Sequence, residues 1–175
     1  MKKIKVCFLL MAICMLFTAC SNHASQAGVT HLMNSDYSAA IDSFQDAIEK
    51  QDNVADAYRG IGMARWEQEN YEGCLSALQK ALDNGVERTA PLYAMMGSCC
   101  MKLVDYDAAI SYYELAMDLS AQGEPLMQEL LRNRIVCYEK SGDLKKAKEY
   151  LEVYQQLYPT DENARREVQF LETRE

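Results

Sequence analysis

Cysteine is the side chain with the most reactive chemistry in this sequence of 175 residues, which contains seven cysteines and only two histidines. Thiols act as nucleophiles, metal ligands and disulfide partners. Cys99 and Cys100 are adjacent, but neither His23 nor His31 has the spacing to acids or cysteines that a metal site requires. No nucleophile elbow, phosphate-binding loop or paired-carboxylate motif occurs either. The sequence therefore predicts a protein that is not an enzyme and that needs no metal or other cofactor.

Cys20 stands between an apolar segment and a polar one. Residues 1–5 are short and basic, residues 6–19 are apolar apart from Thr18, and a polar run follows the cysteine. A charged start, an apolar middle and a small residue before a cut are the parts of a secretory signal. The apolar run is shorter than the roughly 20 residues that a transmembrane helix needs. We therefore expect export of the chain.

The residues Leu16-Phe17-Thr18-Ala19-Cys20 resemble the lipobox of bacterial lipoproteins, with Phe17 where leucine is usual. The resemblance implies a lipoprotein signal peptide over 1–20, lipidation of Cys20 and a flexible tether over 21–26. Two or three acyl chains would anchor the protein stably. The expected location is the outer face of the cell membrane, or the outer membrane if the organism is Gram-negative. The alternative is an ordinary signal peptide that is cut near Ala19.

The charge of the chain excludes one class of partner. Removal of residues 1–20 takes away three lysines and no acid, which changes the formal net charge from −8 to −11. Proteins that bind nucleic acid need a basic stripe to neutralise phosphates. This sequence contains no such stripe, so we expect no nucleic-acid partner.

The rest of the chain repeats a pattern of small and large residues. Four similar segments begin 34, 35 and 38 residues apart, and each has a small residue followed four positions later by a large one. Such a constant period is typical of helical repeat arrays. The small residues are Ala40, Cys74, Ala109 and Ala147, and the large ones are Phe44, Leu78, Tyr113 and Leu151.

This pattern resembles the tetratricopeptide repeat (TPR), W-x2-L-G-x2-Y followed by A-x3-F and P. The resemblance implies an all-α fold, a right-handed α-solenoid of about four TPR helix pairs plus a C-terminal capping helix. Helix pairs would stack because none buries its apolar face alone. Only the fourth repeat keeps the final proline, Pro159. The expected repeat domain spans 27–175, with repeats at about 24–54, 55–87, 88–124 and 125–159 and a capping helix over 160–173.

The first helix of each pair lines the concave face in this family. On such a helix, one stripe of residues packs the repeats together. A second apolar stripe beside it would mark a binding groove. Met and Trp are adaptable or anchoring residues at protein surfaces. The alternative is that these side chains pack against the neighbouring repeat. The predicted groove residues are Leu32, Arg59, Met63, Trp66, Met101 and Arg132, with the two arginines placed to hold a carboxylate.

The cysteines after Cys20 fit the repeat as small core residues. Cys74 takes the small position of the second repeat, and Cys99 and Cys137 correspond to Ala64. A buried cysteine behaves as a small hydrophobe. A bridge between Cys99 and Cys137 remains the alternative.

These patterns predict a membrane-anchored adaptor of the bacterial cell envelope that binds a peptide or helix of a partner protein. The membrane contact would be made through lipid on Cys20. One alternative is a fixed subunit of an envelope assembly or secretion complex, and another is a thiol-dependent enzyme that uses Cys99 or Cys100. The sequence does not identify the partner.

Overall fold

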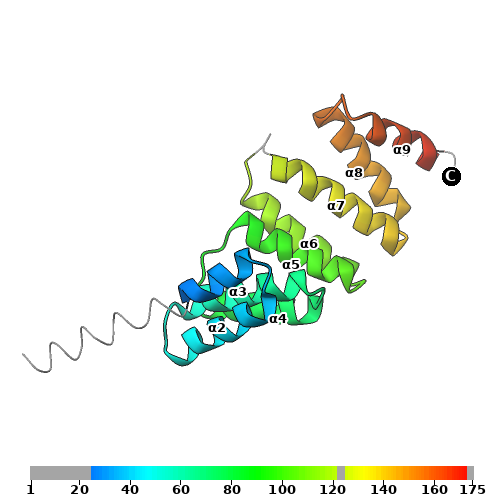
Figure 1. Ribbon diagram of the computed structural model, residues 1–175. Helices are drawn as coiled ribbons and strands as arrows, with labels where there is room; N and C mark the ends of the chain where they lie inside the picture. Colours follow the sequence, from blue (N-terminus) through cyan, green and yellow to red (C-terminus); the bar gives the residue numbers. More distant parts are fainter. Residues whose placement is uncertain (1–24, 122–124, 173–175) are drawn as a thin grey trace, which may run out of the picture. The chain divides into compact units, whose positions relative to one another are not determined.

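The computed structural model describes residues 25–121 and 125–172. Within them every regular element is a helix (Figure 1). The chain divides into two compact units, Met1–Glu87 and Arg88–Glu175. The signal segment, Cys20 and residues 21–24 of the expected tether lie outside the described residues. None of the helices in the described part of the chain is long and apolar enough to span a bilayer.

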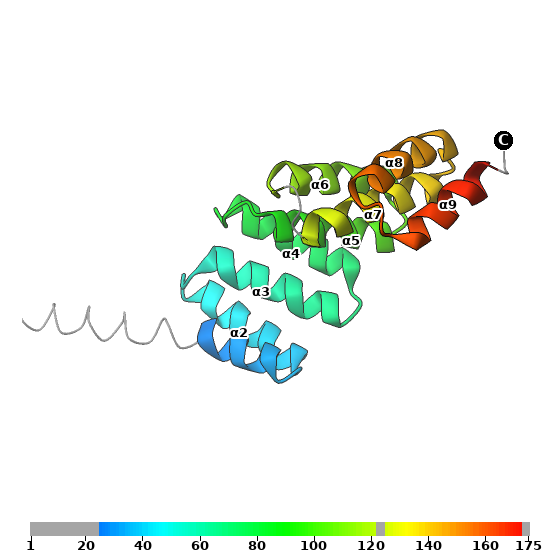
Figure 2. The same cartoon turned by 90° about the horizontal axis from the view of Figure 1, so that it is seen from above.

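The first unit contains a helix over residues 25–33 followed by α2 (Tyr37–Glu49), α3 (Val54–Glu67) and α4 (Tyr71–Asp83). Helix α3 packs against both α2 and α4 and lies between them in Figure 2. The first helix reaches further toward the N-terminus than expected, because Ser25 and Gln26 of the expected tether are helical. The Thr30 hydroxyl donates a hydrogen bond to the Gln26 carbonyl at 3.0 Å, and both residues belong to this helix.

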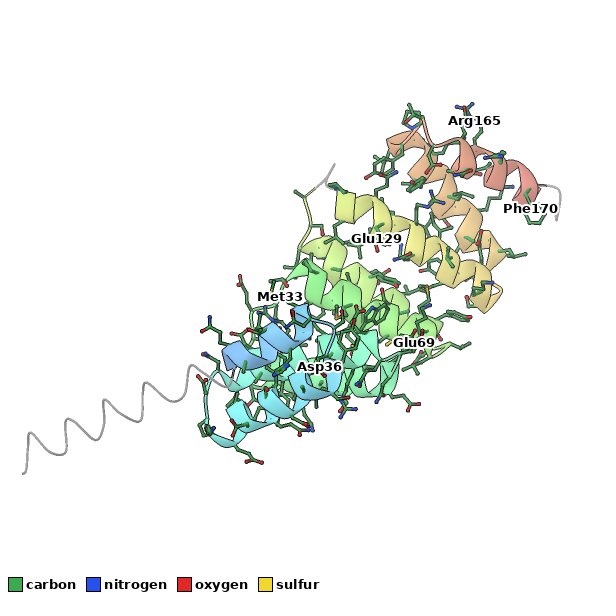
Figure 3. The ribbon with its side chains drawn as sticks, in the orientation of Figure 1. Met33, Asp36, Glu69, Glu129, Arg165 and Phe170 are labelled. Carbon is green, nitrogen blue, oxygen red and sulfur yellow. The ribbon has the colours of Figure 1, made fainter. Side chains whose placement is uncertain are left out.

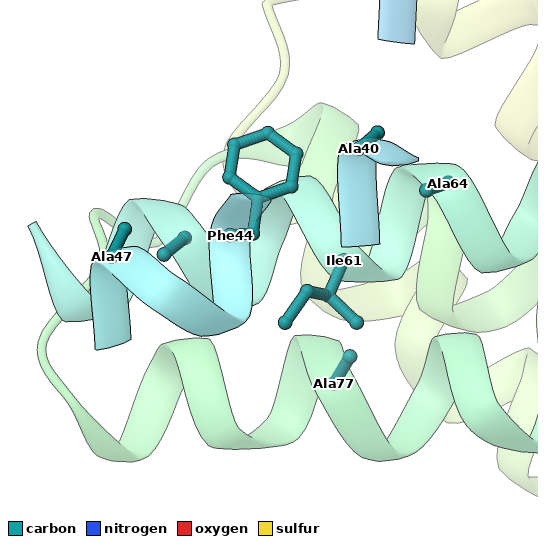
Figure 4. Packing of buried hydrophobic residues seen from close by; sticks show 7 residues of the cluster. Ala40, Phe44, Ala47, Ile61, Ala64 and Ala77 are labelled. Carbon is teal, nitrogen blue, oxygen red and sulfur yellow. The ribbon is translucent and has the colours of Figure 1, made fainter. Parts of the chain in front are cut away.

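Phe44 forms the centre of the core of the first unit. Its ring lies so close to two glycines that a Cβ atom on Gly28 or Gly60 would meet it at 2.7 or 2.4 Å. Glycine is therefore required on both neighbouring helices. Figure 4 shows Phe44 and Ile61 among the small residues that surround them. The buried cluster is Ala40, Phe44, Ala47, Ala57, Ile61, Ala64 and Ala77.

The second unit contains α5 (Ala90–Lys102), α6 (Tyr106–Asp118), α7 (Pro125–Ser141), α8 (Leu144–Leu157) and α9 (Glu162–Glu172). Each helix packs against the next one along the chain. Gly97 of α5 lies against the Tyr113 ring, where a Cβ atom would approach to 2.7 Å. Ala109 and Ala147, at the small repeat positions, are fully buried. The spacing of small residues in the sequence therefore marks the close helix contacts.

The second helix of each pair starts in the same way. An acidic or amide side chain precedes it and accepts a hydrogen bond from the backbone N–H three residues later, which satisfies a donor that the helix leaves unpaired. The donor–acceptor distances lie between 2.9 and 3.4 Å. The capping residues are Asp36, Asn70, Asp105 and Asp143. Three of these four caps are aspartates, whose negative charge also suits the N-terminus of a helix.

The turn inside each pair requires a left-handed backbone conformation. Ser35, Glu69, Val104 and Gly142 all have positive φ, at 62°, 57°, 64° and 86°. They occupy equivalent places, each two residues before a second helix begins. Glycine adopts this conformation without steric cost, whereas a β-branched side chain such as that of Val104 is strained there.

Helix α9 ends the described part of the second unit. Its inner side buries Ala164 and Val168, which are 1% and 9% exposed. Arg165 and Phe170 point outward from it, as Figure 3 shows. The Asp161 carboxylate accepts hydrogen bonds from the backbone N–H groups of Asn163 and Ala164 and so caps the helix. This arrangement fits a terminal capping helix.

Candidate functional site

Three predicted residues of α3 lie on a face that the core does not use. The core of the first unit takes Ala57, Ile61 and Ala64 from this helix. Arg59, Met63 and Trp66 follow one another at spacings of four and three, so their side chains share another face. Arg59 is exposed, Met63 is 38% exposed and Trp66 is half-buried. We call these three residues the α3 stripe.

Trp66 is held in place by an aromatic neighbour. Trp66 and Tyr71, at the start of α4, contact each other edge to face, with ring centres 5.2 Å apart. This geometry is favourable for aromatic pairs and orders the indole while part of it stays accessible. Two further apolar residues, Val29 and Met33, are 47% and 80% exposed on the helix before α2. By contrast, Leu32 of the predicted groove is half-buried and packs against the core of the first unit.

The arginine of the α3 stripe already has a carboxylate partner. Arg59 donates to Asp56, one turn earlier on the same helix, at 2.9 Å, and both side chains are about half exposed. An exposed pair of this kind contributes little to stability and exchanges readily with solvent or with a new partner. It therefore leaves Arg59 available to a ligand at small cost.

Met101 of the second unit is part of a buried hydroxyl network. The Tyr113 hydroxyl donates to the Met101 sulfur at 3.9 Å and lies 3.2 Å from the Ser98 hydroxyl. Burial raises the pKa of Tyr113 to about 12, so this hydroxyl stays protonated at neutral pH. Met101 is half-buried as a result. Part of the Met101 side chain is thus taken up by contact with Tyr113 and is not open to a ligand.

Arg132 of α7 also has an internal partner. It donates to the Asp161 carboxylate at 2.7 Å, and its guanidinium lies 5.8 Å from the centre of the Tyr154 ring. The Tyr154 hydroxyl donates to the same carboxylate at 2.8 Å and accepts a hydrogen bond from Gln128. The hydrogen bond from Tyr154, supported by Arg132 and backbone N–H groups, lowers the pKa of Asp161. Arg132 is therefore engaged between α7 and the start of α9.

The sequence reasoning missed an open pocket within the first unit. It has a volume of about 440 Å³ and lies between α2 and α4, with α3 as its floor. From α3 the lining takes the half-buried Tyr58 and Arg65 and the edge of Ile61, which is 6% exposed. We call it the α2–α4 pocket. Its lining is Gln45, Ile48, Glu49, Tyr58, Ile61, Arg65, Gly73, Ser76, Ala77 and Lys80.

The four later cysteines are buried. Cys74, Cys99 and Cys137 have no exposed surface, and Cys100 is 2% exposed. Burial raises the pKa of both Cys100 and Cys137 from 9.0 to about 11. Because the thiolate is the nucleophilic form, burial holds these two thiols in the less reactive, protonated form at neutral pH. Across residues 25–121 and 125–172, no three His, Cys, Asp or Glu side chains gather as a metal site would require.

Consecutive helix pairs that meet at small residues define the class of α-helical repeat proteins. Two models of the tetratricopeptide repeat match residues 26–85 and 90–122, which together make up more than half of the chain. The chain belongs to the tetratricopeptide-repeat family. The fold class expected from the sequence is confirmed.

Solved structures share this fold at low sequence identity. MamA matches with a TM-score of 0.72 and 16% identity over 86% of this chain and 80% of that one. YrrB, described as a TPR protein with an unusual peptide-binding site, matches at 0.69 and 21% over 85% of this chain and 77% of that one. PilF of Pseudomonas aeruginosa matches at 0.63 and 18% over 89% and 68%. No curated protein matches the sequence significantly.

Proposed function

We propose that this protein is a lipid-anchored adaptor of the bacterial cell envelope whose first helices bind a peptide or helix of a partner protein. One observation carries the binding part of the proposal. Met63 and Trp66 remain accessible, and the core of the first unit is formed by other residues of α3. An aromatic anchor next to an adaptable methionine is a common composition of protein-binding surfaces. The peptide-binding site described for YrrB, which shares the fold, supports the same use.

The anchoring part of the proposal rests on the sequence around Cys20. An apolar segment that ends in Leu16-Phe17-Thr18-Ala19 directly precedes this cysteine. Lipidation at Cys20 would hold the repeats at a membrane surface, where they collect their partner. A thiol-dependent enzyme is the less favoured alternative, because Cys74, Cys99, Cys100 and Cys137 are buried.

Photocrosslinking in cells tests the binding surface. A photoreactive amino acid in place of Trp66 should capture one defined protein, which mass spectrometry then identifies. The matched control is the same substitution at Glu72, an exposed residue of the neighbouring helix α4. Capture from Glu72 alone, or from neither position, would show that the α3 stripe is not the binding surface.

The anchor needs a separate test. Cells that are fed an alkyne analogue of palmitate should label the wild-type protein, and Cys20→Ser should abolish both the label and recovery in the membrane fraction. A variant that stays membrane-bound and labelled would disprove lipidation at Cys20. The two tests are independent, so the adaptor surface is testable whatever the outcome for the anchor.

A further inference from the structure

The α2–α4 pocket has a small residue at a position where both second helices of the second unit have a tyrosine. Ala77 of α4 occupies the repeat position that Tyr112 holds in α6 and Tyr150 in α8. In the second unit these tyrosines pack against the first helix of their own pair. Tyr112 stacks on Tyr93 with ring centres 6.4 Å apart, and Tyr150 stacks on Tyr138 at 5.3 Å. Alanine at position 77 supplies no such ring, and its side chain lines the pocket.

The pocket floor carries a guanidinium with no acidic partner. Arg65 is half-buried, and among the described residues no carboxylate lies within ion-pair distance of it. Its side chain lies directly on α4, where a Cβ atom on Gly73 would approach the Arg65 Cδ to 2.8 Å. The glycine therefore makes room for the arginine. A partly buried cation that lacks an internal partner is available to an acidic ligand.

The remaining walls combine apolar surface with a second cation. Tyr58, Ile48 and Ile61 supply the apolar area. The Lys80 ammonium lies 5.6 Å from the centre of the Tyr58 ring. Glu49 is the single acid of the lining, against Arg65 and Lys80, in a chain whose formal net charge is −8. The pocket is thus locally basic on an acidic protein, and its volume falls in the range of ligand sites.

We propose that the α2–α4 pocket binds an extended peptide segment of a partner protein, in which an acidic side chain neighbours an aromatic or branched apolar one. The acidic side chain pairs with Arg65, and the apolar side chain fills the space above Ala77. Gln45 and Ser76 on the rims offer hydrogen bonds to the peptide backbone. This inference goes beyond the adaptor surface, because Met63 and Arg65 are two residues apart and so point about 200° apart around the axis of α3.

A display experiment with the full chain tests the inference. The purified protein in detergent micelles is panned against random dodecapeptides displayed between flanking sequences, so that no peptide presents a free C-terminus. We expect enrichment of peptides with an acidic residue next to an aromatic or branched one. The leading sequence is then synthesised with blocked ends, and its affinity is measured by fluorescence polarisation.

Two variants should weaken this peptide by about tenfold or more, the expected loss for a charge-assisted contact or a filled pocket. Ala77→Tyr closes the pocket with the residue that the third and fourth repeats already accommodate. Arg65→Gln removes the charge and leaves the walls intact, so it gives an answer even if a tyrosine at position 77 disturbs α4. Exchange of the peptide acid for its amide should weaken binding to the wild type and have no further effect in Arg65→Gln.

The control is Met63→Ala on the α3 stripe, which should leave the affinity unchanged. Failure to enrich acidic and apolar sequences, or full affinity in Ala77→Tyr and Arg65→Gln, would overturn the inference. Binding that is lost in Met63→Ala but kept in Ala77→Tyr would also overturn it, and would leave the adaptor proposal standing.

Discussion

Arg132 of α7 donates to the Asp161 carboxylate at 2.7 Å, and through this contact a residue expected to hold a ligand instead fastens the start of α9. The two residues are 29 positions apart. Asp161 at the same time caps α9 and accepts the Tyr154 hydroxyl. The carboxylate is therefore shared by all of these contacts. Its removal should lower the free energy of unfolding more than removal of the arginine does.

The first prediction separates these contributions. Asp161→Ala should lower the free energy of unfolding by about 2 kcal/mol, because it removes both the helix cap and an acceptor for a buried hydroxyl. Arg132→Ala should cost less than about 1 kcal/mol, since its side chain is 43% exposed. Asp161→Asn keeps the cap and should fall between them. Urea denaturation measures all three, and an equal loss in both alanine variants would contradict the prediction.

The second prediction concerns strain in a turn. Val104 has a φ of 64°, and its side chain is 66% exposed. Removal of this side chain therefore costs little buried apolar contact. Val104→Gly should raise the free energy of unfolding by about 1 kcal/mol, because a side chain in the left-handed conformation is strained. Val104→Ala keeps the Cβ atom and should gain less. The reciprocal change, Gly142→Val at the equivalent turn, should destabilise. A thermal scan checks the order, and a glycine variant that melts below the wild type would refute it.

The third prediction concerns a buried acid. Asp52 is 6% exposed, and its Oδ2 atom has no hydrogen-bond partner among the described residues. Val86 lies 34 residues later in an equivalent loop, where its N–H also bonds back to the end of a second helix. Asp52→Val should therefore stabilise the fold by roughly 1–2 kcal/mol, the cost of an unsatisfied buried polar group. Asp52→Asn, which stays polar, is the matched control. A loss of stability in the valine variant would show that the carboxylate is needed.

The fourth prediction is a decline of stability in alkali. Cys100 and Cys137 have a pKa of about 11 in the folded chain and 9.0 as the ordinary value. Below pH 9 both are protonated in either state. Between pH 9 and 11 the unfolded chain releases protons that the folded chain keeps, so the free energy of unfolding falls as pH rises. The loss should be on the order of 2 kcal/mol for each thiol.

Cys137→Ala provides the control for this pH dependence. Ala64 occupies the equivalent position in the first unit, so the fold already accommodates alanine there. The variant should lose less stability than the wild type between pH 9 and 11, when denaturant midpoints are compared at both pH values. Identical slopes for the two proteins would mean that the buried thiol does not control the decline.

The fold was predictable because its signals are local. A small residue such as Ala109 and the large residue four positions later report a helix contact within one repeat. An aspartate before a second helix, such as Asp105, reports a cap within three residues. These relationships do not depend on the rest of the chain, so a constant period in the sequence suffices to place them.

The sites were less predictable because they depend on distant partners. From the sequence alone, Arg132 is interpreted as an open groove residue. The structure places the Asp161 carboxylate beside it. The sequence alone does not show that Arg65 lines a pocket, because that pocket is formed together with Ala77 and other residues of neighbouring helices. Repeat alignment contained one usable signal, namely alanine at position 77 where the following two repeats have tyrosine.

Trp66 is the only tryptophan of the chain, and it lies half-buried beside Tyr71 on the α3 stripe. The intrinsic indole fluorescence of the protein therefore originates from a single position at the proposed adaptor surface. An apolar segment that covers the ring would shift the emission to shorter wavelength, whereas a ligand in the α2–α4 pocket would leave the ring in contact with solvent. The native protein thus carries its own optical reporter, which can tell apart occupancy of the two faces of α3 without any label.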